Sequence, residues 1–424
     1  MESIVIYGGK PLMGQVEIQG SKNAVLPMIA AAVLVNGTVC LKGCPQISDI
    51  DDMIKLFEAL GGRVLRKANR DIVLDGKDIH SIKVEREYAG KIRASILYLG
   101  AILGRMGEAM VAKPGGCVIG KRPIDQHIFQ MKNLGYRVDE KSGEYYFYSE
   151  KRESNVTLQL PYSSVGVTEN IILASVLGNQ TVCVKNAAIE PEIRSLCLFL
   201  KKAGALIEGI GTSELMIHGV HRLKDVVFEV PADRIVAGTY AFAAMSTGGV
   251  IELCHVPVNE LECVMKLLLR LGAILDIRED SLTIVAPKVC NRIGYVETGI
   301  YPGFPTDLQS PLLPVLCMAD GNSVVCEKIF ENRFGVVDEL NKMGAKISVN
   351  GTKATVFGKS RLTGASVLAK ELRGGAALII AGLSARGKSQ VSGISYIERG
   401  YEDIVRDLRF LGADIEKITN GETF

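Results

Sequence analysis

The most reactive side chain that the sequence offers is a cysteine in a glycine-rich stretch. Residues 113–123, KPGGCVIGKRP, surround Cys117 with two lysines, an arginine and three glycines, a composition typical of a loop. Nearby cations favour the thiolate form of a cysteine, and glycine hinges let a loop close over a ligand. Cys117 is therefore a candidate nucleophile or general acid. The other cysteines are more typical of small, buried apolar residues.

Polar residues also recur at one spacing before a series of apolar segments. Each lies fourteen residues before a glycine, and the set is Asn23, Arg93, Ser164, Arg234, Asp307 and Arg373. These positions are expected at helix N-termini, where free N–H groups and the helix dipole attract anions. Ordinary capping explains Ser164 and Asp307 equally well. Arginine is a poor N-cap, so the arginines of the set favour a bound polyanion.

Two further arginines and two carboxylates complete the candidates. Arg122 and Arg399 each follow turn-like sequence thirteen residues before a glycine, as site residues or as solvated surface arginines. Asp307 lies in YPGFPTDLQSP, directly before an apolar helix, where the helix dipole would keep a general base ionised. Glu371 stands two residues before Arg373, and a first-turn acid or an ion pair explains it as well as a site role does.

A repeated unit must position these residues. A helix that ends in glycine and leads into a strand returns six times, about every 70 residues. The glycines form two interleaved series: Gly61, Gly135, Gly204, Gly272, Gly344 and Gly412, and Gly37, Gly107, Gly178, Gly248, Gly321 and Gly387. A chain leaving a helix often needs a left-handed residue, which explains glycine at these points.

The third repeat shows the expected elements of each unit. Residues 163–178 and 191–204 have helical patterns, residues 180–186 form a strand, and residues 205–220 form a hairpin. The unit is therefore β-α-β-α-β-β. Because single cores stop growing beyond about 250–300 residues, six units favour two domains of three. The apolar helices are expected inside each domain and the sheets outside, which makes the fold class α/β.

The bulk composition excludes several functions. A net charge of +2 gives no field for nucleic acid or an acidic membrane. Apolar runs of about ten residues are too short to cross a bilayer, and the first residues read as a strand rather than a signal peptide. Scattered cysteines indicate a reducing, cytoplasmic compartment. The chain has no P-loop, no GxGxxG after a first strand, no HExxH and no zinc spacing, so no metal or cofactor is expected.

Several motifs together resemble a known family. QGSKNAVLP, IRASILYLG, KPGGCVIGKRPIDQH, SSVGVTEN, NAAIEPEI, FPTDLQS, FENRF and IERGYE are similar to the UDP-N-acetylglucosamine 1-carboxyvinyltransferases, the enolpyruvyl transferases of the first committed step of peptidoglycan synthesis. The resemblance covers essentially the whole chain. It implies two inside-out α/β barrel domains, each of three β-α-β-α-β-β repeats. The chain would cross between them near residues 21 and 231, giving domains 22–231 and 1–21 with 232–424.

The resemblance also implies a reaction and its residues. The 3-hydroxyl of UDP-N-acetylglucosamine would add to C2 of phosphoenolpyruvate, and phosphate would leave from a tetrahedral intermediate. Cys117 would donate a proton to the methylene carbon and react with fosfomycin, and Asp307 would deprotonate the sugar hydroxyl. Lys22 and Arg399 would complete the catalytic group. The substrate-binding residues would be Asn23, Arg93, Arg122, Pro123, Ile124, Asp125, Gln126, Ser163, Ser164, Val165, Gly166, Ile329, Arg333, Glu371 and Arg373.

The sequence departs from the family pattern at a few positions. Glu371 and Glu398 stand where the family usually has Asp, DRIE reads DRIV with Val236, and RAGAAL or RASASL reads RGGAAL. Two alternatives follow. A shikimate-pathway enolpyruvyl transferase shares the fold but not the cysteine loop, so Cys117 speaks against it. A divergent, non-catalytic paralogue that binds the UDP-sugar draws its support from Glu371.

Overall fold

The structure, a computed structural model, describes residues 2–112, 119–120, 123–150 and 153–419. Two predicted site residues, Cys117 and Arg122, lie outside the described residues. The chain divides into two compact units. Among the described residues, unit 2 comprises 20–112, 123–150 and 153–231, and unit 1 comprises 2–19, 119–120 and 232–419.

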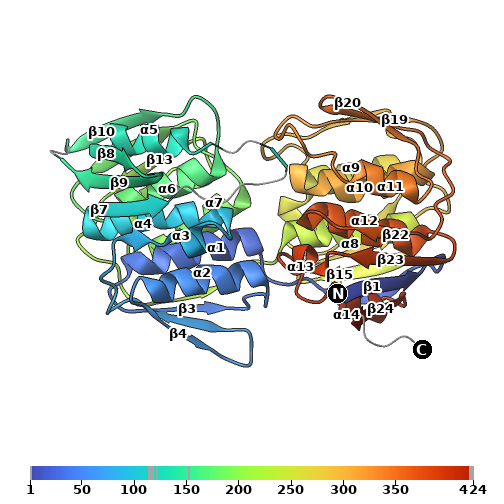
Figure 1. The fold of residues 1–424 in the computed structure, drawn as a ribbon, viewed down its shortest axis with the longest axis horizontal. Coiled ribbons are helices and arrows are strands. Elements are labelled where there is room, and N and C mark those ends of the chain that lie inside the picture. The colour runs from blue at the N-terminus through green and yellow to red at the C-terminus, as the bar shows by residue number, and fades with distance from the viewer. Residues whose placement is uncertain (1, 113–118, 121–122, 151–152, 420–424) are drawn as a thin grey trace. The chain divides into compact units, whose positions relative to one another are not determined.

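Unit 2 consists of helices enclosed by three four-stranded sheets (Figure 1). The sheets have the orders β14-β3-β5-β4, β6-β7-β9-β8 and β10-β11-β13-β12. Their strands are β3 (Thr38–Lys42), β4 (Arg63–Arg66), β5 (Ile72–Asp75), β6 (Lys83–Val84), β7 (Glu108–Ala112), β8 (Tyr136–Lys141), β9 (Glu144–Ser149), β10 (Asn155–Gln159), β11 (Thr181–Lys185), β12 (Leu206–Glu208), β13 (Glu214–His218) and β14 (Val226–Glu229). The central helices are α1 (Lys22–Ala31), α4 (Leu97–Met106) and α6 (Val165–Ser175), and the amphipathic ones are α2 (Ser48–Ala59), α5 (Asp125–Asn133) and α7 (Pro191–Lys202).

Unit 1 repeats this plan with sheets β16-β17-β15-β2, β18-β19-β21-β20 and β22-β23-β1-β24. Its strands are β1 (Glu2–Tyr7), β2 (Met13–Glu17), β15 (Val250–Cys254), β16 (Ile274–Ile277), β17 (Ser281–Val285), β18 (Tyr295–Glu297), β19 (Ser323–Cys326), β20 (Ile347–Asn350), β21 (Lys353–Val356), β22 (Ser366–Leu368), β23 (Lys388–Ser392) and β24 (Asp414–Thr419). Its central helices are α8 (Arg234–Thr247), α10 (Gln309–Met318) and α12 (Leu372–Ser384), with α9 (Glu262–Leu271), α11 (Val337–Lys342), α13 (Ile394–Ile397) and α14 (Ile404–Phe410) around them.

All six sheets share one pairing pattern, which confirms the predicted repeat. One edge pair is parallel, and the other two pairs are antiparallel. In the third repeat, Val182 lies opposite Ile217, and Ile217 lies opposite Ile207. All three side chains are buried, so one apolar row of this sheet faces the helices.

The central helices are buried on every side, as their apolar sequences predict. In α12, every residue from Arg373 to Leu383 is buried. Small residues let neighbouring central helices approach closely: a β-carbon at Gly104 in α4 would lie 2.4 Å from the carbonyl oxygen of Leu173 in α6. Each fully buried Leu or Ile contributes roughly 1.5–3 kcal/mol, so these helices form the cores of the two units.

The glycines of the two series have positive φ angles, with the exception of Gly37. The reason predicted for glycine is therefore wrong at this position. A β-carbon at Gly37 would lie 1.9 Å from Oδ1 of Asp225. That oxygen accepts a hydrogen bond from the N–H of Thr38 at 2.9 Å. At Gly37 the missing side chain leaves room for the carboxylate of Asp225, and the backbone is not left-handed.

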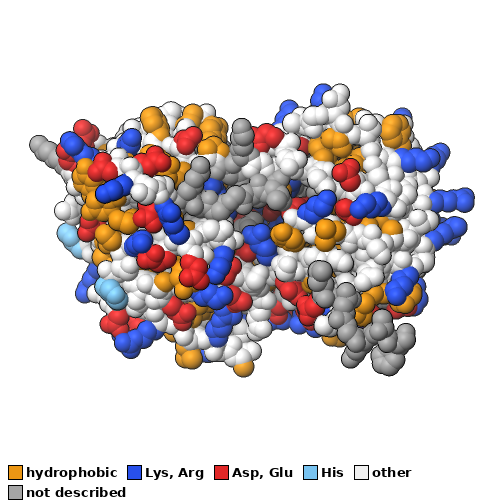
Figure 2. Space-filling model, in the orientation of Figure 1, with side chains coloured by type: hydrophobic (Ala, Val, Ile, Leu, Met, Phe, Trp, Pro, Cys, Tyr) orange, Lys and Arg blue, Asp and Glu red, His pale blue; other side chains and the backbone are white. Residues whose placement is uncertain are grey.

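The surface carries both signs of charge. Figure 2 shows Lys and Arg side chains interspersed with Asp and Glu over the drawn face, with small groups of hydrophobic side chains between them. In the part of the chain that the structure describes, no helix has the length and apolar character needed to span a bilayer.

Candidate functional site

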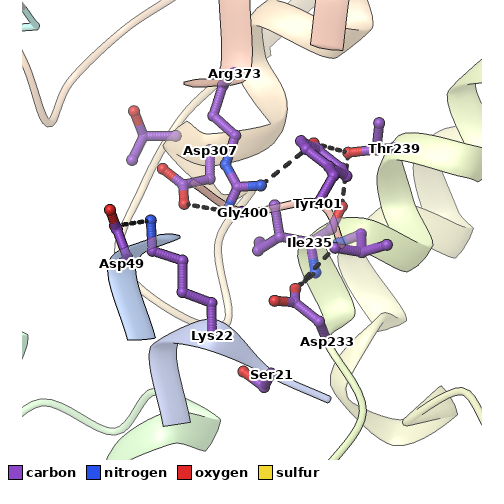
Figure 3. A network of polar contacts seen from close by, with 12 residues as sticks. Ser21, Lys22, Asp49, Asp233, Ile235, Thr239, Asp307, Arg373, Gly400 and Tyr401 are labelled. Carbon is purple, nitrogen blue, oxygen red and sulfur yellow. Dashed lines mark hydrogen bonds and ion pairs between the residues drawn. The ribbon is translucent and has the colours of Figure 1, made fainter. Parts of the chain in front are cut away.

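Asp307 of unit 1 is held between two arginines. It lies in the 3₁₀ helix η4 (Thr306–Leu308), immediately before α10. Nη2 of Arg333 donates to Oδ1 at 2.7 Å. Nη2 of Arg373 donates to Oδ2 at 3.0 Å (Figure 3). Both arginine side chains are 3% exposed, whereas that of Asp307 is 29% exposed. The acid therefore remains accessible while the cations that orient it are buried.

Arg373 is fixed from a second direction by an aromatic hydroxyl. Its Nη1 donates to the Tyr401 hydroxyl at 3.3 Å, and that hydroxyl is 2.8 Å from Oγ1 of Thr239 in α8 (Figure 3). Burial lowers the pKa of the Arg373 guanidinium, but the charge of Asp307, followed by Tyr401, outweighs burial and raises it above its ordinary value. A cation at the start of α12 opposes the helix dipole, and these partners stabilise it there.

Glu371 caps the same helix. It is the N-cap of α12, and its carboxylate accepts hydrogen bonds from the backbone N–H groups of Arg373, at 2.8 Å, and of Gly374. Its Oε2 also lies 3.7 Å from Nη1 of Arg333. The longer side chain at this position therefore serves as a cap and joins the ion pairs around Asp307.

A buried carboxylate that the sequence did not single out joins Ile329 to this cluster. Glu327 is 1% exposed, and its Oε1 accepts from the N–H groups of Ile329 and Phe330 at 2.8 and 3.1 Å. Its Oε2 accepts from Oγ1 of Thr306 at 2.9 Å. Glu327 thus attaches the segment that carries Ile329 to the residue before Asp307. Only its position just after an apolar strand, in CEKIF, could have indicated it.

The loop that carries Arg399 is clamped by another residue missed in the sequence. The side-chain amide of Gln19 donates from Nε2 to the carbonyl of Gly400 at 3.1 Å and accepts at Oε1 from the N–H of Glu402 at 2.8 Å. This pair of bonds flanks Tyr401, the partner of Arg373. Arg399 therefore belongs to the same framework in unit 1 as Arg373.

In unit 2, Lys22 forms a buried ion pair. Ser21 is the N-cap of α1, and its hydroxyl accepts from the N–H of Ala24 at 3.3 Å. Nζ of Lys22 lies 2.5 Å from Oδ2 of Asp49, which is in the first turn of α2 (Figure 3). Both side chains are at most 10% exposed. Asn23 is the next residue of α1.

Arg93 holds the segment that begins at Pro123. It opens the 3₁₀ helix η2 (Arg93–Ile96) ahead of α4, and its Nη2 donates to the carbonyl of Pro123 at 3.2 Å. Ile124 is the N-cap of α5, and Asp125 is the acid of its first turn. Gln126 follows, and its Oε1 is buried with no hydrogen-bond partner among the described residues.

The second predicted nucleotide segment lies at the start of α6. Ser164 is the N-cap of this helix, Val165 is its first residue and Gly166 its second, with Ser163 just ahead. A β-carbon at Gly166 would lie 3.4 Å from Cε1 of His127. Because His127 directly follows Gln126, the structure brings residues 123–126 and 163–166 together. It does not describe Cys117 or Arg122, so these two are not placed with the rest. Across the described ranges, no group of three or more His, Cys, Asp or Glu side chains could hold a metal ion.

The fold is that of an enolpyruvyl transferase. The family model described as EPSP synthase (3-phosphoshikimate 1-carboxyvinyltransferase) matches residues 6–408. Among solved structures, the enolpyruvyl transferase NikO from Streptomyces tendae superposes with a TM-score of 0.88. It is 24% identical, and the match covers 99% of each chain, so this likeness concerns the fold.

Curated relatives identify the family within this class. UDP-N-acetylglucosamine 1-carboxyvinyltransferase 2 of Caldanaerobacter subterraneus subsp. tengcongensis is 42% identical over 99% of this chain and 100% of the relative. The protein of the same name from Listeria monocytogenes is 39% identical over 100% of this chain and 99% of the relative. The chain belongs to the UDP-N-acetylglucosamine 1-carboxyvinyltransferase family.

Proposed function

We propose that the chain transfers the enolpyruvyl group of phosphoenolpyruvate to the 3-hydroxyl of UDP-N-acetylglucosamine. The observation that carries this proposal is the full-length likeness to relatives that bear this enzyme's name. The hydroxyl oxygen adds to C2 of phosphoenolpyruvate while C3 gains a proton. The tetrahedral intermediate then loses a proton from C3 and expels inorganic phosphate, which leaves an enol ether. This is the first committed step of peptidoglycan synthesis and hence of cell wall biogenesis.

The residues of unit 1 are assigned to the sugar hydroxyl and the developing charge. Asp307 takes the hydroxyl proton, because its carboxylate is the accessible member of a cluster whose arginines are buried. Arg333 and Arg373 orient the carboxylate, and Glu371 fixes the start of α12 from which Arg373 projects. Arg399 binds a negative charge of a substrate, and Ile329 contacts the UDP-sugar.

The residues of unit 2 are assigned to the nucleotide and to phosphoenolpyruvate. Lys22 and Asn23 bind phosphoenolpyruvate from the start of α1, where free N–H groups also favour an anion. Arg93 and Arg122 bind phosphate or carboxylate groups, and Cys117 donates the proton to C3. The segments that line the UDP-sugar site are Pro123, Ile124, Asp125 and Gln126 with Ser163, Ser164, Val165 and Gly166.

We assign the reaction to the cytoplasm and to two functional domains, residues 22–231 and residues 1–21 with 232–424. The described cysteines are all free, which suits a reducing compartment. The pairing of β1 with β23 and β24, and of β2 with β15, supports grouping the first strands with the second half of the chain.

Phosphate release from phosphoenolpyruvate tests the function. The full chain is assayed with UDP-N-acetylglucosamine and, separately, with shikimate 3-phosphate. We expect phosphate release when UDP-N-acetylglucosamine is the acceptor and none when shikimate 3-phosphate is the acceptor. Release with shikimate 3-phosphate alone would assign the chain to the other acceptor. A Glu371→Asp variant, assayed in parallel, is expected to release phosphate at a similar rate.

One departure from the family pattern favours a second candidate, a non-catalytic UDP-sugar-binding paralogue. The departure is the glutamate at position 371, where the family pattern has aspartate. The candidate predicts that calorimetry detects UDP-N-acetylglucosamine binding while neither acceptor supports phosphate release. It also predicts that Glu371→Asp restores release. The capping bonds of Glu371 keep the start of α12 intact and so favour the catalytic assignment.

A further inference from the structure

His127 lies at the junction of the two segments assigned to the UDP-sugar. It is 6% exposed, in the first turn of α5, directly after Gln126. Its ring edge at Cε1 packs over Gly166, where a β-carbon would lie 3.4 Å away. Residues 123–126 thus lead directly into His127, and the backbone of residues 163–166 contacts its ring at Gly166.

The other side of the ring meets a buried amide of α6. Nδ2 of Asn170 lies 2.8 Å from Nδ1 of His127, and Asn170 is 0% exposed. Its Oδ1 accepts from the N–H of Gly100 at 2.7 Å, and Nδ2 donates to the carbonyl of Ile96 at 3.0 Å. In a continuous α-helix this N–H and this carbonyl would bond to each other. Asn170 therefore bonds to both backbone groups at the junction of η2 and α4.

These partners determine the orientation of the amide without reference to the ring. The N–H of Gly100 can only donate, and the carbonyl of Ile96 can only accept, so Oδ1 and Nδ2 cannot exchange places. Gly100 must also be glycine for this contact, because a β-carbon there would lie 2.6 Å from Oδ1 of Asn170. The second hydrogen of Nδ2 then points at Nδ1 of His127.

A donor aimed at Nδ1 selects one form of the imidazole. Nδ1 must be unprotonated to accept, so the single ring proton of the neutral form lies on Nε2. A proton on Nδ1 would place two donors 2.8 Å apart in a buried site. The interaction therefore sets both the tautomer and the rotation of the ring.

We propose that His127 is a positioning residue of the nucleotide-sugar site. Held by Asn170 as the Nε2-protonated tautomer, it fixes residues 123–126 against residues 163–166. This role rests on the proposed function, since it concerns the binding of UDP-N-acetylglucosamine. Arg93 supports the same segment independently through the Pro123 carbonyl, so loss of His127 loosens the site without releasing it.

Variants of the full chain distinguish the effect of the Asn170–His127 hydrogen bond from that of the ring's volume. His127→Asn keeps an acceptor near the place of Nδ1, whereas His127→Phe keeps a ring without one. His221→Phe, at an exposed position, is the matched control. By calorimetry with UDP-N-acetylglucosamine, we expect His127→Phe to raise Kd about tenfold, which is about 1.4 kcal/mol and near the value of one buried hydrogen bond. His127→Asn is expected within about threefold of wild type, and the KM for phosphoenolpyruvate should stay unchanged in each variant.

Nitrogen-15 NMR of the wild-type chain reads the tautomer directly, which is practical with five histidines. An unprotonated Nδ1 and a protonated Nε2 are expected for His127. A proton on Nδ1, or a Kd for His127→Phe equal to that of His221→Phe, would overturn the positioning role. Wild-type binding of the UDP-sugar in that case leaves the proposed function standing. A wild-type chain that binds no UDP-sugar overturns both.

Discussion

The carboxylate of Glu371 occupies the space that a β-carbon on Gly374 would need. Such a carbon would lie 2.6 Å from Oε1 of Glu371, which accepts a hydrogen bond from the N–H of residue 374. The family pattern that the sequence resembles has the shorter aspartate at position 371 and alanine at position 374. The two departures therefore compensate each other: the longer acid reaches the same N–H groups because the side chain at 374 is missing.

This relationship predicts strong coupling between the two positions. Gly374→Ala alone is expected to bring no stability, because the helix propensity gained, about 1 kcal/mol, is offset by a disturbed N-cap worth roughly 0.5–2 kcal/mol. In a Glu371→Asp background the same change should stabilise by about 1 kcal/mol. Thermal melts of the four proteins close the double-mutant cycle. Additive effects would contradict the compensation.

Asp307→Asn should abolish most turnover while leaving the nucleotide bound. The amide keeps the shape but cannot take a proton, so kcat is expected to fall about 10²- to 10⁴-fold. The Kd for UDP-N-acetylglucosamine should change less than about threefold, since one contact to the sugar is altered and not removed. Asp276→Asn is the control, because Asp276 is an exposed acid that pairs with Arg278 at 3.2 Å. Turnover equal to that of the control would exclude Asp307 as the base.

Glu169→Gln should stabilise the protein at neutral pH and not in acid. Burial, then the charges of Glu192 and Glu190, raises the pKa of the Glu169 carboxyl well above its ordinary value. An acid whose pKa is higher in the folded state adds its full contribution to the free energy of unfolding below the unfolded pKa of about 4.5. That contribution is lost as the pH rises toward the folded pKa. Glutamine is neutral throughout, so the variant should melt at least about 2 °C higher at pH 8 and equally near pH 4.

The control for this pH series is Glu208→Gln. Glu208 has a side chain that is 75% exposed, so its replacement should leave the melting temperature unchanged at both pH values. A Glu169→Gln variant whose melting temperature equals that of wild type at every pH from 4 to 8 would contradict the prediction. It would show that ionisation of Glu169 does not lower the stability of the folded state.

Thiol reagents should modify Cys117 selectively in the folded protein. Burial raises the pKa of Cys197 and of Cys317 to about 12, and that of Cys290 to about 11. These thiols stay protonated at pH 8, and only a thiolate is a strong nucleophile. Mass spectrometry after treatment with fosfomycin is expected to find one adduct, on Cys117, and Cys117→Ser should carry none. An adduct on another cysteine would contradict the assignment.

The repeats and the buried central helices could be predicted because both depend on patterns between residues that are close in the sequence. Glycine spacing marked where each helix ends, and uninterrupted apolar runs marked helices such as α12 that are buried on all sides. The polar residues ahead of those runs were found for the same reason. Ser164 is an N-cap, and Arg93 and Arg373 lie in first turns, as the fourteen-residue spacing indicated. Glu371, which the sequence marked only by its place two residues before Arg373, is also an N-cap.

The partners of these residues could not be predicted, because they come from distant parts of the chain. Lys22 pairs with Asp49, Arg373 with Tyr401, and Gln19 with the backbone on both sides of Tyr401. No periodicity links such positions, and each side chain alone suits an ordinary surface residue. Asn170 is the clearest case, since a polar residue in an apolar helix gave no hint that it bonds to the backbone of α4.

The strand pairing carries a consequence for the order of synthesis. β14 closes unit 2 by pairing with β3, so every strand of that unit has left the ribosome once residue 229 is free of the exit tunnel. β1 is made first, yet both its partners, β23 and β24, are made last. During synthesis, unit 2 can therefore fold completely while β1 still lacks both of its partner strands. A translational pause after residue 231 would let unit 2 fold before unit 1 is synthesised.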